Sequence, residues 1–183
     1  MNRVSQTLAF ILEWFLMLLM VMLSVIVVVA VVYRKFDASL SWYDEVASVT
    51  LAWITYYGGA LAVLKRKHIG FDSVLLSIPM PVRLYVALFA EFVFLAFFAL
   101  LAWAGWQVVL VLEGTSLVSL RWVSVQITQS VIPIGAVLFI LCELLAAPAY
   151  LKMVIAGESA EHADIEAEIE AEMAALANTE VKR

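Results

Sequence analysis

The sequence predicts an all-α integral membrane protein with four transmembrane helices. Hydrophobic residues make up 65% of the chain and charged residues only 15%, whereas soluble domains have nearly half apolar and about a quarter charged residues. The apolar residues gather in four runs, each long enough to cross a hydrocarbon core of roughly 30 Å. These runs cover residues 8–33, 46–64, 84–112 and 131–151.

The first run is expected to remain in the protein as a helix. Its apolar stretch is far longer than the hydrophobic region of a secretory signal peptide, which has about 7–15 residues, and no small-x-small cleavage site follows it.

The second run predicts a helix with both ends marked. Ser41 followed by Asp44 is a capping-box pattern, and Asp44 and Glu45 place negative charge at the positive end of the helix, so it should begin near Trp42. From Val46 to Leu64 the chain has no charged residue. Basic residues then end the span: Lys65, Arg66, Lys67 and His68.

One face of this second helix is small and weakly polar. Such a face favours helix–helix packing, because small residues let two backbones approach. It would pack either against another protein or against the other helices of this chain. Its residues recur at alternating spacings of three and four: Glu45, Ser48, Ala52, Thr55, Gly59 and Ala62.

The loop between the second and third runs predicts a short helix in the membrane interface. Apolar residues recur at helical spacing from Phe71 to Ile78, and Pro79 and Pro81 end the pattern. The basic residues around it suit anionic lipid headgroups, or a specific lipid or partner carboxylate. The candidates at this edge are Lys65, Arg66, Lys67, His68, Asp72 and Arg83.

Charge asymmetry predicts the orientation. Eight Lys and Arg residues fall on the side of both termini and the middle loop, against three on the other side. By the positive-inside rule, both termini face the cytoplasm.

Two parts are expected along the chain: a membrane domain at 1–157 and an acidic cytoplasmic tail at 158–183. The tail holds eight acidic and two basic residues. It would be a solvated, partly helical extension or a docking segment for a cytoplasmic partner, and its charge disfavours nucleic acid.

No enzyme, cofactor or metal site is predicted. The chain has two histidines, neither inside an apolar run, and one cysteine, Cys142, expected in the core. It has no phosphate-binding glycine loop or nucleophile elbow.

Three carboxylates lie within the apolar runs: Glu13, Glu91 and Glu143. Ionisable groups inside a membrane are functional candidates. They would form a converging proton or cation site, or each would pair with a basic side chain at the cytoplasmic edge or with a partner subunit.

The second helix and the following loop resemble the signature of the small membrane subunit of tripartite ATP-independent periplasmic (TRAP) transporters, the DctQ-like family. The resemblance covers about residues 8–151, and Pro133-Ile134-Gly135 is similar to the family's P-x-G. The family often has proline before the fourth helix, whereas residues 115–122 have none. The matching residues of the signature are Trp42, Glu45, Trp53, Gly58, Gly59, Arg66, His68 and Asp72.

The resemblance implies an accessory subunit in the bacterial inner membrane. A large permease subunit would carry out sodium-driven uptake of an organic acid, delivered by a periplasmic binding protein, and the small subunit would be its stationary scaffold. The expected subunit-interface residues are Trp42, Glu45, Ser48, Ala52, Trp53, Thr55, Gly58, Gly59 and Ala62. The expected contacts to the binding protein are Lys35, Asp37, Glu113 and Arg121.

Two other functions remain open from the sequence. A self-contained, homodimeric, proton-coupled exporter would use Glu13 as its ion site. A membrane assembly factor without a transport role would depend on the acidic tail.

Overall fold

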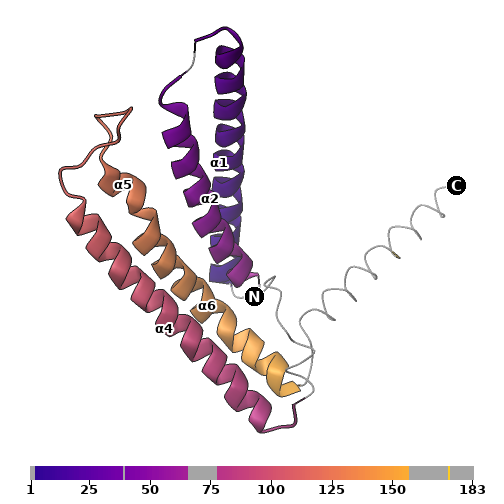
Figure 1. Ribbon diagram of the computed structural model, residues 1–183. Helices are drawn as coiled ribbons and strands as arrows, with labels where there is room; N and C mark the ends of the chain where they lie inside the picture. The colour runs from indigo at the N-terminus through magenta and orange to yellow at the C-terminus, as the bar shows by residue number, and fades with distance from the viewer. Residues whose placement is uncertain (1–2, 39, 66–77, 157–172, 174–183) are drawn as a thin grey trace, which may run out of the picture. The chain divides into compact units, whose positions relative to one another are not determined.

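A computed structural model describes residues 3–38, 40–65, 78–156 and 173 (Figure 1). Its helices are α1 (Arg3–Lys35), α2 (Tyr43–Leu64), α4 (Val82–Val111), α5 (Val125–Gln129) and α6 (Val131–Ala156). Within these ranges, four helical segments are long and apolar enough to cross a membrane, with α5 and α6 counted together. The described residues contain no β-strand. The all-helical, four-span fold class is therefore confirmed, whereas the expected interfacial helix near 71–78 falls almost entirely outside the described residues.

The helices extend beyond most of the predicted spans. α1 begins five residues before the predicted run at 8–33. α6 continues five residues past the end of the predicted run at 131–151. Hydropathy marks only the part of a helix that suits lipid, while backbone hydrogen bonding continues into flanking polar residues. The short α5 was not predicted. Its start is set by Ser124, whose hydroxyl accepts a hydrogen bond from the backbone N–H of Gln126 at 3.2 Å.

The chain divides into two compact units. The first comprises residues 1–67 and 93–146, and the second comprises 68–92 and 147–183. The first unit thus holds α1, α2, α5 and the adjoining segments of α4 and α6.

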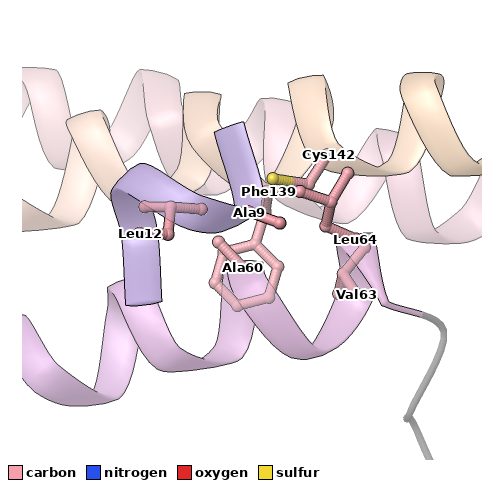
Figure 2. Packing of buried hydrophobic residues seen from close by; sticks show 7 residues of the cluster. All are labelled: Ala9, Leu12, Ala60, Val63, Leu64, Phe139 and Cys142. Carbon is pink, nitrogen blue, oxygen red and sulfur yellow. The ribbon is translucent and has the colours of Figure 1, made fainter. Parts of the chain in front are cut away.

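A small apolar core holds the first unit together. Figure 2 shows its side chains converging from α1, α2 and α6. The smallest residues of this cluster are alanines, which allow the helix backbones to lie close. Its buried members are Ala9, Leu12, Ala60, Val63, Leu64, Phe139 and Cys142.

Aromatic rings extend this core toward α4. The ring of Phe139 stacks on that of Phe98, with centroids 4.3 Å apart and planes inclined by 13°. Phe98 in turn contacts Phe94 at 4.6 Å. Phe139 therefore joins the core on α1 and α2 to the aromatic residues of α4.

In the second unit, Arg83 connects the start of α4 to the end of α6. Its Nε donates to the Ile78 carbonyl at 3.1 Å, and Nη1 donates to the Val154 carbonyl at 3.3 Å. Val154 lies in the last turn of α6, where carbonyl groups lack helical partners and a cation is favoured.

Candidate functional site

Glu45 fastens a distant loop to the start of α2. Its Oε1 accepts a hydrogen bond from the backbone N–H of Val118, and its Oε2 accepts one from Ser119, both at 3.0 Å. The Ser119 hydroxyl also donates to the Ser41 carbonyl at 2.9 Å. We call this set of three bonds the Glu45 clamp. Sequence reasoning singled out Glu45 but not its loop partners, because they contribute backbone groups that have no residue signature.

The predicted capping box is wrong. The N-cap of α2 is Trp42, and in the described structure no side chain makes a capping hydrogen bond there. Ser41 lies one position earlier and contributes its carbonyl to the clamp instead. The expected start near Trp42 is confirmed, since the helix begins at Tyr43.

Two signature glycines allow α2 and α6 to approach closely. A Cβ placed on Gly59 would lie 2.5 Å from the Phe139 ring, and one on Gly135 would lie 2.9 Å from the Cβ of Tyr56. Neither contact is possible for a larger residue without displacement of a neighbour. A Cβ on Gly58 would meet only Leu16, at 3.9 Å. Both glycines thus serve packing within this chain, and for Gly59 this is one of the two possibilities that the sequence left open for its face of α2.

The remaining small face of α2 is only partly used inside the chain. Ser48 and Thr55 are exposed, while Ala52 and Ala62 are half-buried. The two hydroxyls bond to carbonyls of their own helix, at 3.0 Å for Ser48 and 2.9 Å for Thr55. The two hydroxyl groups on the exposed part of the face therefore already have hydrogen-bond partners.

The two signature tryptophans occupy half-buried positions. The Trp53 ring stacks on Tyr57 with centroids 5.8 Å apart, and Tyr57 meets Phe15 of α1 edge to face. The Trp53 indole N–H is buried and has no hydrogen-bond partner among the residues that the structure describes. Trp53 thus contributes to the contact between α1 and α2 through Tyr57.

Glu13 forms an ion pair with Lys65, the residue that caps the end of α2. Both side chains are 38% exposed. Lys65 is one of the basic residues predicted from the sequence as a partner for Glu13. The pair joins α1 to the C-terminal end of α2, where a positive charge is also favoured by the helix dipole.

The other two intramembrane carboxylates differ in exposure. Glu143 is only 4% exposed and follows the fully buried Cys142 on α6, while Glu91 on α4 is half-buried. Within the described ranges, no cluster of three or more His, Cys, Asp or Glu residues could hold a metal ion.

The remaining candidates are placed only in part. Of the proposed residues at the cytoplasmic edge, Arg66, Lys67, His68 and Asp72 lie outside the described residues, and Arg83 bonds to backbone carbonyls as above. The four candidates for contact with a binding protein are all exposed: Lys35, Asp37, Glu113 and Arg121.

Comparison with known proteins identifies the family. No curated protein matches the chain. Residues 23–148 match the family model described as tripartite ATP-independent periplasmic transporters, DctQ component. The match covers more than half of the chain, and it contains Glu45, Gly59 and Gly135. This multi-pass membrane chain therefore belongs to the DctQ family, a family of TRAP transporter components and not of enzymes.

Proposed function

We propose that the chain is the small permease subunit of a TRAP-type secondary transporter. In this role it scaffolds a large permease subunit for sodium-driven uptake of an organic acid, which a periplasmic binding protein delivers. The family match over residues 23–148 carries the proposal, and the four membrane-spanning helices are consistent with it. The Lys and Arg distribution supports insertion into the bacterial inner membrane with both termini in the cytoplasm.

The structure offers one surface that suits such a partner. Ser48, Leu51 and Thr55 lie exposed along α2 at helical spacing, with both hydroxyls bonded to their own helix. The small residues of this strip, Ser48 and Thr55, would let a second helix approach closely. We propose that this strip packs against the large permease subunit.

The packing of α2 supports a stationary role for this surface. α2 is fixed to α1 by the Glu13–Lys65 pair and the apolar core, and to α6 by the close contacts at Gly59 and Gly135. A helix fixed at several points along its length can present the strip without moving. That property suits a scaffold against which another subunit moves.

Co-purification with the large permease subunit tests the proposal. The tagged chain is isolated from its native membrane in mild detergent, and its companions are identified by mass spectrometry. We expect a much larger multi-helix membrane protein in about one-to-one ratio. Recovery of the chain only with itself, under conditions that keep other membrane complexes intact, would refute the subunit role.

Reconstitution tests the coupling and the substrate class. Vesicles that contain both membrane subunits should take up an organic acid only when the binding protein and an inward sodium gradient are present. Equal uptake without the small subunit would contradict the scaffold role, and uptake without sodium would contradict the driving ion.

A further inference from the structure

The loop between α4 and α5 is an ordered hairpin. The Leu117 N–H donates to the Val123 carbonyl, and the Val125 N–H donates to the Thr115 carbonyl, both at 3.1 Å. Residues 118–122 form the turn between these two arms, and we call them the loop tip. The Glu45 clamp holds the tip through two backbone N–H groups and one hydroxyl. The tip therefore has a defined position on the first unit.

The clamp also sets the depth of the loop tip in the membrane. Glu45 immediately precedes the uncharged stretch of α2 that ends at Leu64. These residues span about 28 Å of helix, close to the roughly 30 Å thickness of the hydrocarbon core, so Glu45 marks one edge of that core. Because the N–H groups of Val118 and Ser119 lie 3.0 Å from its carboxylate, the loop tip lies at the same edge.

The loop tip has two chemically different sides. Ser119, which bonds to the clamp, is half-buried. Val118 and Trp122 are instead 86% and 84% exposed, and Arg121 between them is also exposed. Exposed apolar residues continue beyond the tip at Val111 of α4 and Ile127 of α5.

We propose that the loop tip is a lipid anchor, in which Val118 and Trp122 enter the headgroup region and Arg121 binds lipid phosphate. Tryptophan is favoured at this depth, because its ring is apolar while its N–H finds water or headgroup oxygen. The long Arg side chain reaches phosphate from the same level. A lipid occupant explains the two apolar residues as well as the charge. A soluble binding protein suits the tip less well, because it would have to cover Trp122 and Val118 at the membrane surface. The inference does not depend on the proposed permease partner.

Spin-label accessibility tests the anchor. Val118→Cys is made in a Cys142→Ala background, and the chain is isolated with the partners it retains. It is then reconstituted in vesicles of phosphatidylethanolamine and phosphatidylglycerol. Matched labels at Ala38, in the exposed loop before α2, and at Leu100, on an exposed face of α4, give the water and lipid references.

Each outcome of this measurement decides between occupants. We expect the label at position 118 to be more accessible to oxygen than to a water-soluble nickel chelate. The lipid reference at position 100 should show the same preference, and the water reference at position 38 should show the opposite one. Greater access to nickel would overturn the proposal, because the tip would then lie in water. Low access to both reagents would also overturn it, in favour of a protein that covers the tip.

Tryptophan quenching tests the same inference without a cysteine. Lipids brominated near the headgroup end of the acyl chain should quench a larger fraction of the tryptophan fluorescence in the native chain than in Trp122→Phe. Quenching by acrylamide should be nearly equal for the two proteins. If the substitution instead lowers acrylamide quenching and leaves bromine quenching unchanged, Trp122 faces water and the anchor is refuted.

Discussion

The Oε2 atom of Glu45 accepts a hydrogen bond from the backbone N–H of Ser119 at 3.0 Å, which joins α2 to a loop 74 residues further along the chain. The neighbouring N–H of Val118 binds the other carboxylate oxygen. A carboxylate that accepts two backbone N–H groups makes charge-assisted bonds, which are stronger than bonds between neutral groups. The Glu45 clamp therefore orders a loop that lies between two membrane-crossing helices.

Replacement of Glu45 by Gln should release the loop tip. The amide retains one acceptor oxygen but directs an NH2 group at the second backbone N–H, so one bond is lost and a donor faces a donor. A hydrogen bond to a charged group contributes about 1.5–3 kcal/mol. We expect faster hydrogen exchange in peptides that contain residues 115–123.

Asp44→Asn is the matched control for the clamp. Asp44 is exposed and carries the same charge one residue earlier, outside the clamp. Its replacement should leave exchange of the loop unchanged. Equal protection of residues 115–123 in Glu45→Gln and in the native chain would show that the carboxylate does not hold the loop.

Replacement of Gly135 by Ala should force α2 and α6 apart. The added methyl group would lie 2.9 Å from the Cβ of Tyr56, which cannot move without its helix. Overpacking of this kind costs about 1–3 kcal/mol. The midpoint of thermal unfolding in detergent should fall by several degrees, whereas Gly58→Ala, with its nearest neighbour at 3.9 Å, should unfold near the native temperature. Equal midpoints for the two variants would contradict the close packing at Gly135.

The sequence predicted the membrane spans because their signal is continuous. A run of apolar residues that crosses a bilayer needs no knowledge of its neighbours, so the four spans and the end of α2 at Leu64 could be read directly. The ends that extend into polar flanks, and the five-residue α5, depend on capping and backbone hydrogen bonds and were missed.

The partners of the candidate residues could not be predicted. The pattern at Gly59 indicated close packing but not that Phe139 fills the space, since that contact depends on how α2 and α6 align. The capping-box prediction failed for a related reason. Ser41 and Asp44 have the residue types of a local motif, but no side chain makes a capping bond at Trp42 in the described structure, and the Ser41 carbonyl accepts a hydrogen bond from Ser119 of the loop instead.

Replacement of Glu13 by Gln should leave substrate uptake close to that of the native complex. Glu13 is paired with Lys65, and both side chains are partly exposed, so the pair stabilises the chain by about 0–1 kcal/mol. Lys65→Met should have a similarly small effect on thermal stability, because either change removes the same pair. Uptake by the reconstituted complex checks the result. Abolished uptake in Glu13→Gln with the complex still assembled would give the carboxylate a transport role.

Replacement of Ser48 and Thr55 by Trp should separate the chain from the large permease subunit. Both positions are exposed on α2, so the chain itself has room for the larger side chains and should keep its stability. A close helix–helix contact would not have that room, because its backbones approach across small residues. The yield of the large subunit in co-purification measures the loss. Leu18→Trp is the matched control, since it places the same residue at an exposed position of α1 that is already large and apolar. Loss of the partner with the control but not with Ser48→Trp and Thr55→Trp would move the interface from α2 to α1.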